Sequence, residues 1–432
     1  MRTGPVDRWA STSTGPARPR PGPTPSGVRE ASGMTSSARP GPLDGIQVID
    51  LTTARSGPTC VRQLVDLGAQ AIRIAAPGRG DLPGSDGWNL HRAKRSMLVD
   101  LATESGRDIL LRLVARADVL VENFRPAVKH RLRIAPDDLF AANPRLVYGS
   151  ISGFGQDGPY ADRPGVDQIA QGLSGLMSVT GPPGTGPWRA GIAVSDSTAG
   201  TFLAQGIIAA LFARERTGHG QWVHTSLLES MVNLMDFQAA RVVNEGDVPR
   251  QAGNDHPTLF PMGTYPTADG YVNVAGMLGF DRFCEVLGHP EWATDERFAA
   301  VGARVAHRDE LTRLVDEVLT TRSTAEWVRL LNDAGIPAGP VCSLDETFAD
   351  PQIRHLALAA PTPPDEGRRP AVVLRHPVTF TDTPAAVRGG VPSPGQDTVP
   401  VLAELGLDAD EIERLLGAGV VAERLGADAR VI

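Results

Sequence analysis

The chain has 432 residues, of which 41% are hydrophobic and 21% are charged, and its formal net charge at pH 7 is −8. This composition is typical of a soluble globular protein, and the length predicts two or three domains. The acidic balance argues against a nucleic-acid-binding surface, and no apolar run reaches the roughly 18 residues of a membrane span. We therefore expect neither nucleic acid nor a membrane among the partners.

Cysteine usage narrows the class further. Cys60, Cys284 and Cys342 lie far apart and have no His at metal-ligand spacing. This pattern predicts neither a disulfide scaffold nor a metal site, and it fits a reducing, cytoplasmic compartment.

Residues 1–41 differ from the rest of the chain. They are rich in arginine, proline and small polar residues and contain almost no aliphatic side chains. Such a segment cannot bury enough apolar surface to offset its ordering entropy, so we predict a disordered leader. It has no apolar core of the kind that a secretory signal needs.

From residue 42 onward, apolar runs alternate with amphipathic ones. The pattern predicts strands at residues 46–51, 71–75, 97–101, 119–122 and 146–151, with helices between several of them. This alternation indicates an α/β fold with a parallel sheet that helices cover on both faces. The turn after the first strand reads TTARSGPT and lacks G-x-G-x-x-G, so a dinucleotide site is poorly supported.

A single carboxylate, Asp196, stands between a small-residue segment (190–195) and a long apolar helix. Asp196 or Ser197 is expected to cap this helix, whose positive end would hold the carboxylate ionised and its pKa low. A carboxylate among small residues is also open to attack a substrate. Taken alone, the segment fits a plain helix cap better than a nucleophile.

The pattern of predicted secondary structure changes near residue 227. A hairpin is expected at 264–275, followed by helices at 279–287, 308–320 and 324–334, and two further helices are expected near the C-terminus. We predict four parts: the leader 1–41, the first part of a large domain 42–226, a smaller α+β domain 227–345, and a segment 346–432 that returns to the large domain.

Nine short strings in fixed order carry the most specific signal. They include PLDGIQVIDLTTARSGP (42–58), ADVLVENFRP (117–126), NPRLVYGSISGFGQDGPYADRPGVDQIAQGLSGLMSVTG (143–181) and AVSDSTAG (193–200). Together they resemble family III CoA transferases, the formyl-CoA and carnitine CoA-transferase type. The resemblance covers residues 42–421.

The resemblance implies a Rossmann-like large domain, a homodimer of interlocked rings, and Asp196 as a nucleophile. In such enzymes the carboxylate attacks an acyl-CoA thioester to form a mixed anhydride. The released CoA thiolate then converts the anhydride to an aspartyl-CoA thioester, from which an acceptor acid takes CoA. Coenzyme A and acyl-CoA are thus expected as substrates, with no tightly bound cofactor.

The family's binding positions can also be placed on this chain. The expected CoA contacts are Arg55, Ser56, Val99, Asp100, Leu101, Ala102, Asn123, Phe124, Arg125, Arg131 and Asp167, with Lys94 and Arg95 as weaker candidates. Guanidinium groups pair phosphates well, although each arginine alone fits solvated surface equally. In the loop 250–263, Asn254 and His256 are substrate-contact candidates, and His256 also fits a loop brace. Apolar side chains at Leu259, Phe260 and Met262 hint at an acyl group less polar than oxalate.

Two other functions stay open. The α-methylacyl-CoA racemase branch of the same fold typically places a His before the Asp of a G-x-D turn, but this turn reads Gly165-Val166-Asp167. Valine cannot carry a proton, which disfavours racemisation. The other alternative is a catalytically silent acyl-CoA-binding protein, against which the intact Asp196 argues.

Overall fold

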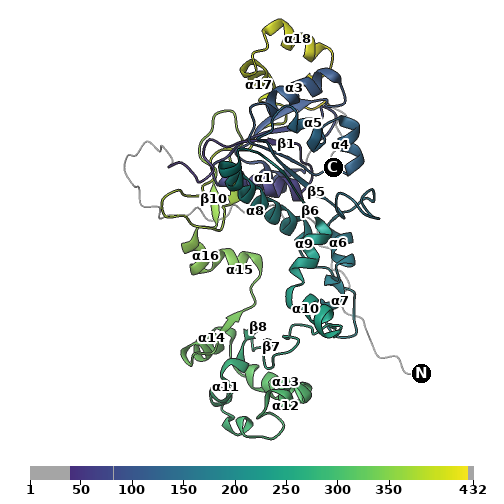
Figure 1. The fold of residues 1–432 in the computed structure, drawn as a ribbon. Helices are drawn as coiled ribbons and strands as arrows, with labels where there is room; N and C mark the ends of the chain where they lie inside the picture. Colours follow the sequence, from purple (N-terminus) through teal and green to yellow (C-terminus); the bar gives the residue numbers. More distant parts are fainter. Residues whose placement is uncertain (1–38, 81, 427–432) are drawn as a thin grey trace, which may run out of the picture. The chain divides into compact units, whose positions relative to one another are not determined.

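The computed structural model describes residues 39–80 and 82–426 (Figure 1). The predicted leader lies almost entirely outside this part of the chain. Among the described residues, no helix combines the length and the apolar character that crossing a membrane requires.

A seven-stranded sheet dominates the fold, with the order β12-β3-β2-β1-β4-β5-β6. Its strands are β1 Gln47–Asp50, β2 Gln70–Ala75, β3 Arg95–Val99, β4 Val119–Glu122, β5 Val147–Ser152, β6 Trp222–Ser226 and β12 Val421–Ala422. All neighbouring pairs are parallel except β12, which runs antiparallel to β3. Every residue of β4 and β5 is buried, as expected for strands with both faces covered. The predicted α/β fold with a mostly parallel sheet is therefore confirmed.

Helices cover both faces of this sheet (Figure 1). One core cluster joins it to α1 Ser56–Asp66 and α8 Val194–Thr217, and includes Val61 and Ile207. The other joins it to α3 Glu104–Val114, α5 Pro136–Phe140, α17 Thr398–Glu404 and α18 Ala409–Gly417. The C-terminal helices thus pack on the large sheet, as the sequence predicts.

The strand order creates a crevice at the carboxyl ends of two neighbouring strands in the middle of the sheet. The chain leaves β1 through α1 on one face, whereas it leaves β4 through α4 Pro126–Leu132 and α5, and α5 lies on the other face. Since β1 and β4 are neighbours, their connections diverge at their carboxyl ends. Open α/β sheets bind ligands at such a switch point.

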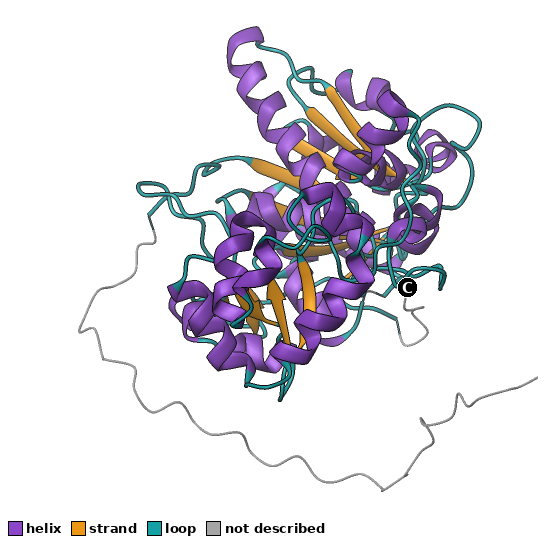
Figure 2. Ribbon diagram, turned by 90° about the horizontal axis from the view of Figure 1, so that it is seen from below, coloured by secondary structure: helices purple, strands orange, loops and turns teal. Residues whose placement is uncertain are grey.

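A second, three-stranded antiparallel sheet consists of β7 Gly263–Pro266, β8 Tyr271–Val274 and β9 Ala338–Pro340. It shares a third core cluster with α11 Phe280–Leu287, α13 Arg308–Leu319 and α14 Thr324–Asp333. The predicted hairpin is present as β7 and β8, and the three predicted helices are present as α11, α13 and α14. Figure 2 distinguishes the strands, in orange, from the helices, in purple.

Each of the remaining elements contains ten residues or fewer. They comprise α2 Gly84–His91, α6 Asp167–Leu173, α7 Leu176–Val179, α9 Leu227–Leu234, α10 Asp236–Glu245, η1 Gly276–Gly279, η2 Pro290–Ala293, α12 Val301–Ala306, α15 Leu344–Ala349, α16 Pro351–Leu356, β10 Ala359–Pro361 and β11 Val372–Leu374. Sequence periodicity does not predict most of them, because many contain fewer than ten residues.

A fully buried ion pair lies under the crevice. Lys94 Nζ is 2.8 Å from Asp50 Oδ2, and both side chains have no exposed surface. Asp50 ends β1 and accepts hydrogen bonds from the backbone N–H and hydroxyl of Thr52. Burial alone would raise the pKa of Asp50, but Lys94 and Thr52 outweigh it and lower the pKa. Lys94 is therefore buried beneath the β1–α1 loop and holds it in place. A side chain that contacts CoA would instead have to be accessible at the surface.

Replacing Lys94 by Met should destabilise the protein by about 3–5 kcal/mol, because it leaves the buried Asp50 carboxylate without its partner. The control is Glu317→Gln in the exposed pair with Arg313, which should change the free energy of unfolding by less than about 1 kcal/mol. Urea unfolding at pH 7 measures both. Equal, small losses in the two variants would contradict the prediction.

Candidate active site

A cavity of about 210 Å³ lies at the carboxyl ends of β1, β4 and β5. Five of the predicted site residues line it: Ser56, Asn123, Phe124, Arg125 and Asp196. Its other lining residues are Thr53, Ala54, Ile151, Ser152, Gly153, Gly165, Val166 and Leu227. The switch-point crevice and the singled-out carboxylate therefore coincide.

Asp196 is the third residue of α8, and the cap position is Ala193. The prediction that Asp196 or Ser197 caps the helix is therefore wrong. The cap comes from another segment: Asp167 Oδ1 accepts the Ser195 N–H at 2.9 Å, the Ser195 hydroxyl at 2.8 Å and the Asp196 N–H at 3.5 Å. Because Asp167 satisfies these donors, the Asp196 carboxylate is available to the cavity.

Close helix packing fixes where Asp196 lies. A Cβ on Gly200 would stand 2.5 Å from the Ser56 carbonyl oxygen, so only glycine lets α8 approach the start of α1 this closely. At this approach, the Ser56 side chain hydrogen-bonds the Asp196 carboxylate. Gly153 and Gly165, which both line the cavity, approach each other equally closely, because a Cβ on Gly153 would stand 2.8 Å from Gly165 Cα.

The electrostatics of the site differ from the sequence expectation. Burial, followed by the nearby negative charge of Asp167, raises the pKa of Asp196 to about 6. Arg55 and the Ser56 hydrogen bond oppose the shift but do not cancel it. The expectation of a low pKa is therefore wrong, because desolvation and a like charge outweigh the partial positive charge of the helix end.

Two strand ends are tied together across the crevice. Asn123 Oδ1 accepts the Thr53 N–H at 2.9 Å, and Asn123 Nδ2 donates to the Thr53 carbonyl at 2.8 Å. The Phe124 N–H donates to buried Glu122, which Lys129 pairs at 3.3 Å. The loops after β1 and β4 are therefore held rigidly at the cavity.

The arginine candidates occupy different settings. Arg55 forms an ion pair with Asp86 of α2, and its charge acts on Asp196. Arg125 is exposed where it lines the cavity, and Arg131 is exposed on α4. Asp167 does not line the cavity, because its carboxylate binds the start of α8.

Residues 99–102 follow β3, two strands away from β1, and do not line the cavity. Val99 is buried, and Leu101 is half-buried. Asp100 Oδ1 accepts the Ala102 N–H at 3.0 Å. These residues share the carboxyl edge of the sheet with the cavity, but the structure does not bring them together with Asp196.

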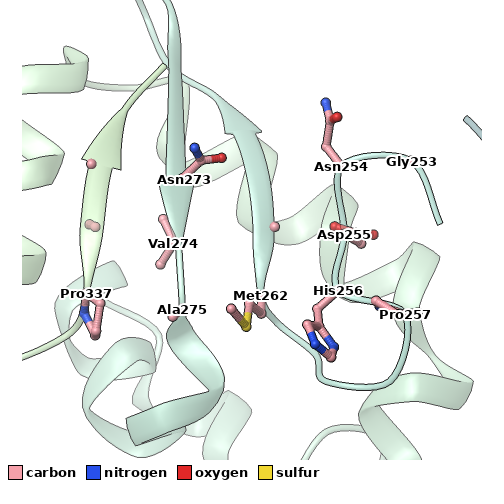
Figure 3. A pocket seen from close by; sticks show the side chains of 13 residues that line it. Gly253, Asn254, Asp255, His256, Pro257, Met262, Asn273, Val274, Ala275 and Pro337 are labelled. Carbon is pink, nitrogen blue, oxygen red and sulfur yellow. The ribbon is translucent and has the colours of Figure 1, made fainter. Parts of the chain in front are cut away.

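Asn254 and His256 line a second cavity of about 580 Å³, built by residues 253–257 and strands β7 to β9 (Figure 3). His256 Nδ1 accepts the Leu259 N–H at 3.1 Å, and its ring stacks on Phe237 at 5.8 Å between centroids. These contacts fit the loop-brace interpretation. Phe260 is fully buried in the third core cluster, so it gives no information on acyl polarity.

Sequence reasoning did not select Gly153 or Leu227, and it considered Val166 only as part of a turn. Val166 lines the same cavity as Asp196 and is 62% exposed. The available signal was the position of Gly153 two residues after the end of the predicted strand 146–151. In the part of the chain that the structure describes, no group of three or more His, Cys, Asp or Glu side chains could hold a metal ion.

The raised pKa predicts a measurable effect on stability. The ordinary Asp value is 3.8, so the folded state binds a proton more tightly than the unfolded state, and stability is lost as the pH rises through about 6. Asp196→Asn should therefore stabilise the protein by about 1–3 kcal/mol at pH 8 and by little at pH 4. Urea unfolding at both pH values measures this, with Glu413→Gln on the exposed face of α18 as the control. An Asn variant no more stable than the wild type at pH 8 would refute it.

Comparisons with known proteins identify the family. The family model described as CoA-transferase family III matches residues 43–398. The chain is 37% identical to a succinate–glutarate CoA-transferase of Agrobacterium fabrum, over 84% of this chain and 96% of the relative. It is 38% identical to an acetyl-CoA:oxalate CoA-transferase of Acetobacter aceti, over 74% and 85%. A solved CaiB/BaiF family structure from Brucella suis matches with a TM-score of 0.76 at 34% identity, over 85% of this chain and all of that one. Matches of this extent leave one conclusion: the chain is an enzyme of CoA-transferase family III.

Proposed function

We propose that the protein moves CoA from an acyl-CoA donor to a free carboxylic acid, with Asp196 as the covalent nucleophile. One observation carries the proposal: a half-buried carboxylate opens into the cavity at the sheet's switch point. With a pKa of about 6 it is mostly ionised at pH 7, yet more basic than an ordinary Asp. Both properties favour nucleophilic attack.

The first half of the reaction forms the enzyme thioester. An Asp196 oxygen attacks the thioester carbonyl, the C–S bond breaks, and CoA leaves as a thiolate. The thiolate then attacks the aspartyl carbonyl of the mixed anhydride, and the donor acid leaves as a carboxylate. Each step exchanges one anion for another, so no external proton or metal is consumed.

The second half repeats these steps in reverse with a new acid. The acceptor carboxylate attacks the aspartyl-CoA thioester and expels CoA thiolate. The thiolate attacks the acyl carbonyl of the new anhydride, which releases the product acyl-CoA and restores the Asp196 carboxylate. The hydrogen-bonded loops at Thr53 and Asn123 keep the cavity in a fixed shape, which limits access of water to the reactive anhydrides.

CoA would lie along the carboxyl edge of the large sheet. Ser56 and residues 123–125 would contact its reactive end, while Arg55, Arg125 and Arg131 would face its phosphates. Residues 99–102 lie farther along the same edge and would contact the nucleotide. Arg55 must then exchange its partner Asp86 for phosphate, at a half-exposed pair where such exchange costs little.

The acid is proposed to be small, and a dicarboxylic acid is the favoured class. The relatives named above are named for succinate, glutarate and oxalate. A cavity of about 210 Å³ matches acids of this size. Val166 beside Asp196 offers no proton, which argues against the racemase alternative.

An interlocked homodimer is proposed as the working form, in which each chain's loop 250–263 covers the partner's site. Helices α8 to α10 and the segment after them carry exposed apolar side chains, including Phe212, Val243 and Val248 at 65%, 79% and 71% exposure. Apolar surface of this kind marks interfaces. The loop itself is anchored by Asp255, whose carboxylate pairs with Arg308 at 3.0 Å.

Removing the nucleophile tests the chemistry. Asp196→Ala should lower CoA transfer by at least about 10⁴-fold, because no other group can carry the covalent intermediate, while the Kd for CoA should stay within a few-fold. A screen of acyl-CoA donors against free acids, read by mass, supplies the assay. Hydroxylamine with acyl-CoA should convert Asp196 to a hydroxamate in the wild type. Normal turnover of the Ala variant would exclude the mechanism, and neither turnover nor adduct in the wild type would favour a silent binder.

Solution mass tests the assembly. Light scattering coupled to size-exclusion chromatography should give twice the chain mass of 45.7 kDa. Val243→Glu should weaken this dimer, since it puts a charge into a face that excludes water. Glu413→Gln on exposed α18 is the matched surface control. A wild type that remains a monomer at micromolar concentration would contradict the assembly.

A further inference from the structure

Asp167 places a second carboxylate beside the nucleophile, and the transfer steps above do not use it. Its side chain is only 12% exposed. Oδ1 binds the start of α8 through Ser195, and Oδ2 accepts a 2.6 Å hydrogen bond from Gln171 Nε2. Gln171 in turn accepts the Ala190 N–H at 2.9 Å, which fixes the segment before α8.

A helix cap alone does not require a charge at this position. Ser, Thr or Asn accepts the same N–H groups, and burying an unneeded carboxylate costs free energy. Among the residues that the structure describes, Asp167 forms one ion pair, a loose one with Arg189, whose Nη2 stands 3.9 Å from Asp167 Oδ2 and whose side chain is 47% exposed. The Asp167 charge is therefore poorly neutralised and acts on its neighbours.

We propose that Asp167 is a positioning residue that aims Asp196 and favours its acylation, because acylation removes one of two repelling negative charges. The proposal rests on the proposed function. Before attack, the negative charge of the Asp196 carboxylate is opposed by the neighbouring Asp167. When an Asp196 oxygen bonds the acyl carbon, the negative charge departs with the CoA thiolate, and one buried charge remains. The repulsion returns only when Asp196 is released at the end of the cycle.

The groups around Asp196 determine the sign of the effect. Asp167 on α6 repels the ionised form, whereas Arg55 before α1 and the Ser56 hydroxyl stabilise it. Arg189 partly screens Asp167 from its far side. The raised pKa of Asp196 shows that burial and Asp167 together outweigh the stabilising pair. Asp167 thus makes the free Asp196 carboxylate more basic. It also disfavours this carboxylate relative to the mixed anhydride and the aspartyl-CoA thioester.

Asp167→Asn keeps an acceptor for the Ser195 N–H and removes the charge. The fraction of enzyme trapped as the Asp196 adduct by acyl-CoA and hydroxylamine should fall about tenfold at pH 7. The lower pH limb of adduct formation should move to lower pH, while the Kd for CoA stays unchanged. Ser195→Ala removes a hydrogen bond and keeps both charges, so its pH limb should not move.

Arg189→Gln gives an independent test on a side chain that is 47% exposed. Removing this cation leaves Asp167 less screened, so the pH limb should move in the opposite direction, to higher pH, with a smaller amplitude. An unchanged limb in Asp167→Asn, or the same direction of shift in both variants, overturns the inference. Should Asp167→Asn not fold, the Arg189→Gln shift decides alone. A wild type without an Asp196 adduct instead refutes the proposed function itself.

Discussion

Two buried carboxylates hold the carboxyl edge of the large sheet, and each ends one of the two strands that flank the crevice. Asp50 closes β1 and Glu122 closes β4, and neither side chain is exposed. Each accepts a backbone N–H two residues later, from Thr52 and from Phe124. A parallel sheet alone would leave these loops free to vary, whereas paired internal charges fix the first residue of each.

Each carboxylate needs a buried cation, and the chain supplies it from a different element. Lys94 lies just before β3, and Lys129 lies on α4, where Trp222 also covers its ammonium at 4.8 Å. Buried pairs of this kind contribute little net stability but cost much when broken. They therefore act more through geometry than through energy, and they keep the crevice in a fixed shape.

Helix α8 then brings the reactive group to this fixed edge. Its buried apolar residues face the sheet, and Gly200 removes the side chain that would hold it away from Ser56. The sheet positions the loops after β1 and β4, and the loops form a fixed surface for α8. The packing of α8 against this surface then places Asp196. A single methyl group at residue 200 would disturb a site whose other parts remained intact.

Much of this architecture is local and so could be predicted from the residues. Strands such as 119–122 and helices such as 308–319 follow from hydrophobic periodicity, and the family strings single out Asp196. β6 was not predicted, because its alternating WVHTS is short and pairs with β5 far along the chain. The return of β12 to β3 likewise depends on a contact over three hundred residues, which no local pattern encodes.

The amino-acid sequence by itself determined the fold class, the family and the identity of the carboxylate at the start of α8. Only the tertiary structure decided the state of that carboxylate. Local sequence reasoning predicted that Asp196 caps the helix and has a low pKa, because it considered only the partial positive charge of the helix end. Folding adds burial and brings Asp167 against the same turn from 29 residues away. Both effects act through space in a low-dielectric site, and their sum reverses the local expectation.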